Sequence, residues 1–158
     1  MIAIQVEIKL ALVTCFSLIL IVSYIQYKEK IGQELIIAFL FALIPSLYHF
    51  YQYTTYNIIL LDRINLYPLI CWTAGLVLLR EIYEKMNIKH KLLLITTIYL
   101  FILFTLEFIG FYLLGIRLDS NYPSLLGIGI LHISMPMKIF YLTAGPLYLL
   151  VTDYLKVK

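Results

Sequence analysis

Charged side chains are scarce in this sequence. Asp, Glu, Lys and Arg make up 13% of its 158 residues, whereas soluble domains carry about 25%. Hydrophobic residues reach 63%, against about 45–50% in soluble domains. A chain with so little charge is unable to cover a surface that faces water, so its composition excludes an ordinary soluble fold.

Motifs that mark several common chemistries are also missing. The sequence contains no HExxH zinc motif, Walker loop, GxSxG elbow or Rossmann fingerprint. Its two cysteines, Cys15 and Cys71, lie far apart and outside any CxxC pair, which favours packing roles. The basic residues form short clusters and no continuous stripe, so we expect no nucleic-acid partner. Nothing in these patterns identifies a cofactor.

Long apolar runs occupy most of the chain. Several reach about 18 residues, the length needed to cross the hydrocarbon core of a bilayer. We therefore predict an all-α integral membrane protein, with residues 1–158 forming a single membrane domain in the cell membrane. The five expected spans are residues 10–27, 35–53, 66–83, 92–114 and 136–155.

The last apolar stretch, residues 124–155, is too long for one span and too short for two. Pro136 offers a natural division, because proline is tolerated in the first turn of a helix. We expect residues 124–135 to form a short interfacial or re-entrant segment before the fifth span. The alternative is one long helix with a kink at Pro136.

The distribution of basic residues predicts the orientation. Lys and Arg residues concentrate on the cytoplasmic side of membrane proteins. Five spans put eight of them on one side, namely Lys28, Lys30, Arg80, Lys85, Lys89, Lys91, Lys156 and Lys158. The other side receives three, namely Lys9, Arg63 and Arg117. We therefore expect an outside N-terminus and a cytoplasmic C-terminus.

Glu107 is the clearest candidate for a functional residue. It lies seven residues before the predicted end of the fourth span, or roughly 10 Å deep at 1.5 Å per residue. An ionisable group at that depth is costly and needs a function or a partner. We expect His132 or Lys138 to be that partner, and we name Glu107 and His132 as the candidate catalytic pair.

Other ionisable residues are predicted on the same outer side. They form a candidate ligand-binding set of His49, Asp62, Arg63, Arg117, Asp119 and Lys138. The inner half has basic clusters at its edge and no comparable buried group. This asymmetry indicates a polar pocket that opens to the outside or to the outer leaflet.

Each of these residues also has a structural interpretation. Glu107 can serve as a hydrogen-bonded link between helices, and the histidines as anchors in the headgroup layer. Lys138 can snorkel to the surface, and Arg117 and Asp119 can form a solvated loop pair. Haem ligation by His49 and His132, or copper binding by His132 with neighbouring methionines, has no further support in the sequence.

Three functions fit the predicted pocket. The first is a small enzyme or binding protein for a lipid, isoprenoid or quinone-like molecule, whose head meets Glu107 and His132 while its tail lies among the helices. Acid–base chemistry by Glu107 would then be the mechanism. The second is a non-catalytic subunit that contacts other membrane subunits. The third is a small transporter or proton carrier, as a homo-oligomer for example.

Overall fold

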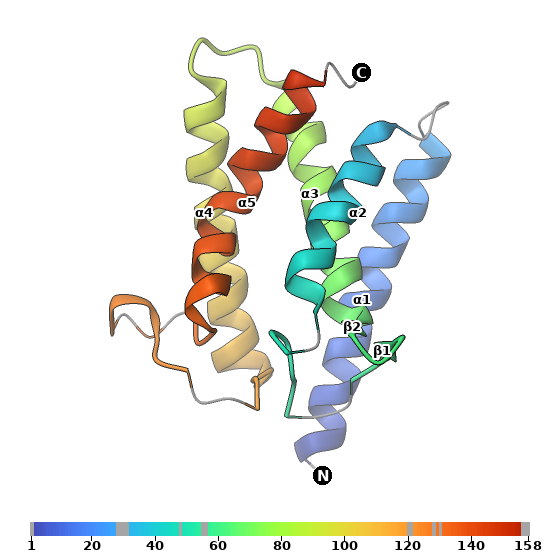
Figure 1. Cartoon of the computed structure of the whole chain (residues 1–158), viewed down its shortest axis with the longest axis vertical. Helices are drawn as coiled ribbons and strands as arrows, with labels where there is room; N and C mark the ends of the chain where they lie inside the picture. The colour runs from blue at the N-terminus through green and yellow to red at the C-terminus, as the bar shows by residue number, and fades with distance from the viewer. Residues whose placement is uncertain are drawn as a thin grey trace.

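Five α-helices pack side by side in the computed structural model of this chain (Figure 1). The structure describes residues 2–27, 32–47, 49–54, 57–119, 122–127, 129 and 131–155. Within these ranges the helices are α1 (Ile2–Tyr27), α2 (Gln33–Ser46), α3 (Leu66–Lys85), α4 (Lys91–Phe108) and α5 (Met135–Tyr154). The described part of the chain is therefore mostly helical, as predicted.

Among the described residues, three helical segments are long and apolar enough to cross a membrane. They are Glu7–Tyr27, Leu66–Lys85 and the continuous segment Lys91–Leu114. The predicted first, third and fourth spans lie within them. Helix α2 has 14 residues, or about 21 Å of length. Helix α5 has 20 residues and is less apolar than α2.

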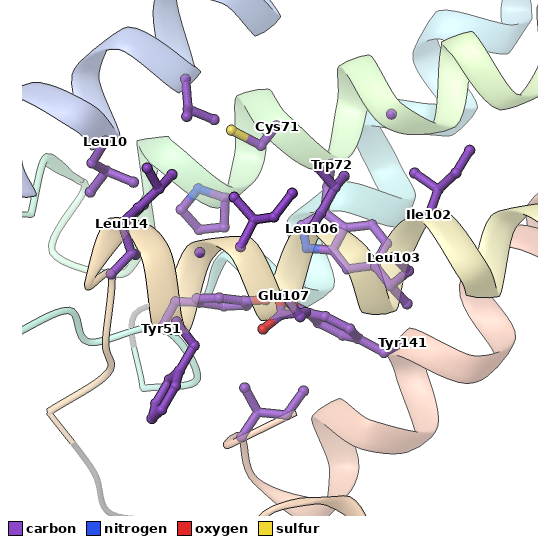
Figure 2. A pocket seen from close by; sticks show the side chains of 18 of the residues that line it. Leu10, Tyr51, Cys71, Trp72, Ile102, Leu103, Leu106, Glu107, Leu114 and Tyr141 are labelled. Carbon is purple, nitrogen blue, oxygen red and sulfur yellow. The ribbon is translucent and has the colours of Figure 1, made fainter. Parts of the chain in front are cut away.

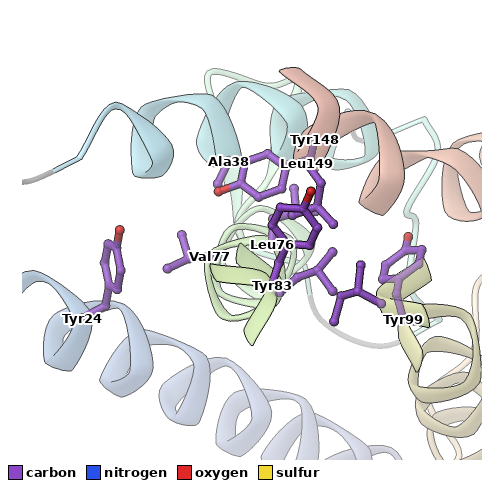
Figure 3. Close-up of a cluster of buried hydrophobic side chains, with 10 residues drawn as sticks. Tyr24, Ala38, Leu76, Val77, Tyr83, Tyr99, Tyr148 and Leu149 are labelled. Atoms are coloured by element: carbon purple, nitrogen blue, oxygen red, sulfur yellow. The ribbon is translucent and has the colours of Figure 1, made fainter. Parts of the chain in front are cut away.

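Helix α3 is the centre of the bundle. Figure 3 shows α2 and α5 on one side of it, with α1 and α4 flanking the other side. The main core lies between α3 and its neighbours, where Leu76, Ile95, Tyr148 and Leu149 are fully buried. Tyr99 of α4 packs on Gly145 of α5 so closely that the glycine has no space for a side chain.

Helix α2 ends seven residues before its predicted end at Tyr53. Pro45 lies in its last turn, where it removes one N–H from the helical hydrogen bonds and so weakens that turn. The chain beyond is held by side chains instead, since the buried Asn65 donates to the carbonyl of Tyr51 at 2.9 Å. Helix α2 therefore covers residues 35–46 of the predicted span 35–53, and the described residues 47 and 49–53 are not helical.

A small hairpin precedes α3 and was not predicted. Strand β1 (Ile59–Leu60) pairs antiparallel with β2 (Ile64–Asn65). Three residues, 61–63, connect the strands, with Leu61 and Asp62 at φ 52° and 57°. The N–H of Arg63 donates to the carbonyl of Leu60 at 3.1 Å and closes the turn. Asp62 and Arg63 are therefore exposed at the tip of this hairpin.

The segment before α5 is not part of a long helix. It contains the short 3-10 helix Leu125–Gly127 and non-helical residues at 131–134. Helix α5 begins at Met135, one residue before the predicted start, with Pro136 in its first turn. The alternative of one long kinked helix is wrong, because residues 131–134, between the short 3-10 helix and α5, are not helical.

An ionic cluster with two buried members, Arg80 and Glu34, lies at the end of the bundle where α2 begins and α3 and α5 end. Arg80 of α3 contacts Asp153 of α5 at 2.6 Å and Glu34 of α2 at 3.7 Å. Glu34 is 1% exposed and Arg80 is 5% exposed. Tyr24 of α1 donates to Glu34 at 2.5 Å, and Tyr83 donates to Asp153 at 2.7 Å. The expectation that this half holds no buried charged group is wrong.

Candidate functional site

A groove of about 490 Å³ runs along one face of α3, between α1 and α4 (Figure 2). Helix α3 contributes residues at helical spacing, among them Pro68, Trp72, Gly75 and Ile82. Pro68 and Ile82 are 14 residues apart, which corresponds to about 21 Å along the helix. Ligand sites in proteins have volumes of about 300–1,000 Å³. The groove thus has the volume of a binding site and an elongated shape.

The groove is open on its side. Leu106 of α4 lines it and is 60% exposed, and Leu78 of α3 and Ile102 of α4 are also both lining and exposed. Gly75 forms part of its floor, where an added side chain would meet no atom within 4 Å. Exposed apolar residues on membrane-spanning helices face hydrocarbon. The open side of the groove is therefore lined by residues of the kind that would face lipid if these helices span a membrane.

Glu107 lies in the last turn of α4, and its side chain is in the groove. Figure 2 shows it between Tyr51 and the Tyr141 ring of α5. Within the described ranges, no hydrogen bond or ion pair reaches its carboxylate. The two expected partners have other contacts: the Nζ of Lys138 donates to the carbonyl of Pro123 at 2.6 Å, and His132 stacks on Phe111.

Three tyrosines surround the same end of the groove. Tyr51 is 6% exposed and Tyr141 is 3% exposed, and both line the groove together with Tyr53. No hydroxyl of these three tyrosines has a hydrogen-bond partner among the residues that the structure describes. These three hydroxyls and the Glu107 carboxylate belong to the lining of the groove. They form a polar end at which a ligand can bind.

A π-helix, η1 (Ile109–Leu114), follows α4 directly and begins two residues after Glu107. Such wider turns often occur at functional sites. Here the π-helix carries Phe111, whose ring stacks on His132 with centroids 4.1 Å apart at 13°. The guanidinium carbon of Arg117 lies 4.9 Å from the centroid of the same ring. His132, Phe111 and Arg117 all line the groove.

His132 has an environment that favours its neutral form. Burial, followed by the positive charges of Lys138 and Arg117, lowers the pKa of His132 below its ordinary value. A neutral imidazole offers one donor and one acceptor. His132 can thus bind a polar group of either kind without adding charge to the groove.

The remaining predicted residues lie away from the groove lining. His49 is exposed, with its ring 4.0 Å from that of Phe50. Asp62 and Arg63 are at the hairpin tip, and Asp119 is an exposed loop residue whose N–H donates to the carbonyl of Gln52 at 2.7 Å. Of the eight predicted residues, the groove is lined by Glu107, His132 and Arg117.

Sequence reasoning missed the aromatic residues of the groove. Trp72, Phe111 and Tyr141 carry no charge and resemble ordinary core residues, while Tyr51 looked like part of an aromatic belt at the membrane surface. The available signal was the helical spacing of Pro68, Trp72, Gly75 and Ile82, which puts these residues on one face of α3. In the described part of the chain, no three His, Cys, Asp or Glu side chains come together as a metal site.

No protein-family model matches this chain, and no curated protein or solved structure matches it. The geometry of the groove is therefore the basis for assigning a function.

Proposed function

We propose that this protein binds a membrane amphiphile in the groove, with the tail along α3 and the polar head at Glu107. The observation that carries the proposal is a mostly apolar groove of about 490 Å³. It is open on its side and has four polar side chains at one end whose hydroxyl or carboxylate groups have no hydrogen-bond partner among the described residues. An isoprenoid, a quinone or another long-chain lipid has this combination of tail and head.

The length of the groove fits a long tail. Its extent of about 21 Å along α3 exceeds half of the roughly 30 Å hydrocarbon core. A tail that moves from lipid into the groove gains little from the hydrophobic effect, because both environments are apolar. Selectivity then depends on the head, where Glu107 and the tyrosine hydroxyls offer hydrogen bonds.

We also propose that all five helices cross the membrane, with the N-terminus outside. Successive helices alternate in direction (Figure 1), and α5 with 20 residues has about 30 Å of length. Arg80, Lys85, Lys89 and Lys91 lie at or near the end where α3 leads into α4, which supports a cytoplasmic location for that end. Lys28, Lys30, Lys156 and Lys158, which entered the charge count, lie outside the described residues.

The proposal is tested by filling the groove. Gly75→Phe adds a large side chain on the floor, where space is open, and Ala11→Phe adds the same ring at an exposed position of α1 outside the groove lining. The protein is purified from membranes in mild detergent, and bound lipids are identified by native mass spectrometry. We expect the parent and Ala11→Phe to retain an amphiphile that Gly75→Phe loses.

Equal lipid retention by all three proteins, or none by the parent after gentle extraction and reconstitution, would contradict lipid binding in the groove. Thermal denaturation of each variant shows whether the fold is intact, so that loss of ligand is distinguished from unfolding.

A further inference from the structure

We propose that the head bound in the groove is a planar, oxygenated ring, such as a quinone or hydroquinone, and not a phosphate. This inference rests on the proposed function and makes its ligand class more specific. Three observations support it: the aromatic residues around the polar end, the hydrogen-bonding groups there, and the balance of charge.

Aromatic side chains hold one another at fixed angles near Glu107. The ring centroids of Trp72 and Tyr141 lie 4.9 Å apart at 77°, and those of Trp72 and Phe140 lie 5.1 Å apart at 72°. Both contacts are edge-to-face, a preferred geometry for aromatic pairs. A flat ring binds well among such surfaces, because it stacks on them and they need little rearrangement.

The polar groups match oxygens attached to a ring. Tyr51, Tyr53 and Tyr141 each have one hydroxyl that can donate to a ring carbonyl. Glu107 can accept a hydrogen bond from a ring hydroxyl when it is ionised, and can donate to a ring carbonyl when it is protonated. The same four side chains therefore suit both a quinone and a hydroquinone.

The charges disfavour a phosphate. Glu107 is the acidic residue and Arg117 the basic residue among the described lining of the groove. Arg117 lies over Phe111, and no described cation contacts Glu107. A phosphate at the tyrosines would place a second negative charge beside this carboxylate in an apolar groove, which is costly. A neutral ring avoids that cost.

Trp72 provides a direct assay. It is the single tryptophan of the sequence and lines the groove, so its fluorescence reports on the site alone. A benzoquinone with a decyl tail, titrated into the protein in detergent, should quench Trp72 in a saturable manner. Gly75→Phe should remove the saturable component and leave only the linear quenching by quinone dissolved in the micelle.

Two substitutions test the hydrogen bonds. Tyr141→Phe and Glu107→Gln should each weaken quinone binding by about three- to tenfold, the usual effect of losing one hydrogen bond. Tyr154→Phe is the matched control, because Tyr154 is exposed at the far end of the same helix, and it should bind like the parent. Unchanged affinity in both groove variants would overturn the assignment of a ring head.

A competing amphiphile separates this inference from the proposed function. Decyl phosphate has the same tail with a phosphate head, and we expect it not to displace the quinone. Suppose that decyl phosphate binds to the parent but not to Gly75→Phe, and that the quinone does not bind. The proposal of a ring-shaped head is then wrong, while the proposal that the groove binds an amphiphile is supported. If Gly75→Phe changes the binding of neither compound, the groove itself is not a binding site.

Discussion

The guanidinium of Arg80 contacts carboxylates from three helices: Glu34 of α2, Glu84 of α3 and Asp153 of α5. Removing the cation would leave buried negative charge without compensation. We expect Arg80→Met to lower the free energy of unfolding by about 1–3 kcal/mol, the range for leaving a buried polar group without its partner. The loss stays below that of a fully buried ion pair because the Asp153 and Glu84 side chains are 43% and 34% exposed. Reversible unfolding in sodium dodecyl sulfate, followed by circular dichroism, measures the change.

Lys85→Met is the control for Arg80→Met, since Lys85 is an exposed cation of the same helix, and it should change stability little. Adding Glu34→Gln to Arg80→Met should recover part of the loss, because fewer charges are then left buried. Equal stability of Arg80→Met and Lys85→Met would show that the cluster does not hold the helices together. The same would follow if the separate effects of Arg80→Met and Glu34→Gln simply added in the double variant.

His132 is the residue whose protonation is most directly tied to the groove. Because folding lowers the pKa of His132, the unfolded chain takes up this proton first. The protein should therefore lose stability as the pH falls below about 6.5, the ordinary value for histidine.

Arg117→Gln removes one of the positive charges that lower the pKa of His132. We expect the pKa of His132 to rise in this variant, as measured by the NMR titration of its ring proton. Arg63→Gln is the control, since Arg63 is an exposed arginine at the hairpin tip and should leave the titration unchanged. A pKa that does not move in Arg117→Gln would mean that Arg117 is not near the imidazole in the membrane.

At the scale of the helices, two glycines in similar Thr-Ala-Gly segments have opposite surroundings. An added side-chain carbon at Gly145 of α5 would lie 2.9 Å from the Tyr99 ring, while at Gly75 of α3 it would meet nothing within 4 Å. We expect Gly145→Ala to destabilise by about 1–3 kcal/mol through overpacking, and Gly75→Ala to change stability by less than about 1 kcal/mol. Thermal denaturation in detergent would compare them, and equal melting points would contradict the close contact of α4 with α5.

The helices were easier to predict than the groove. Apolar runs correctly predicted helices at 66–83 and 92–114 and a start near Pro136 for α5, because each run is long and ends in polar residues. The helical end of α2 was misplaced, since residues 47–53 have the composition of a span. The helix ends at Ser46, and Asn65 holds the next segment by a hydrogen bond to Tyr51.

The candidate site was predicted only in part. The cost of a carboxylate within a span identified Glu107, and position in the chain put His132 at the same end. Which group a side chain meets depends on the π-helix after Glu107 and on the fold of the loop before α5, for which the sequence has no local signal. The ionic cluster around Arg80 was missed because its members lie near predicted span ends, where charges suggest loops.

For the molecule as a whole, orientation in the membrane is the property to measure first. In a variant with Cys15→Ser and Cys71→Ala, single cysteines at Ser120 and Asn87 should react with a membrane-impermeant maleimide from opposite sides, with position 120 labelled from outside. The expectation follows from the concentration of basic residues at the α3–α4 end. Labelling of position 120 only after the membrane is opened would reverse the orientation and place the polar end of the groove inside.

The open side of the groove restricts how the protein can associate with other membrane helices. The opening lies between α1 and α4, whereas α2 and α5 lie across α3 (Figure 3). A helix that packed between α1 and α4, from a second copy or from another subunit, would seal the opening. A bound amphiphile would then be unable to exchange with the membrane while another helix is packed between α1 and α4. Crowding in the membrane would therefore slow the exchange of the amphiphile. Association through α2 and α5 would leave exchange unchanged.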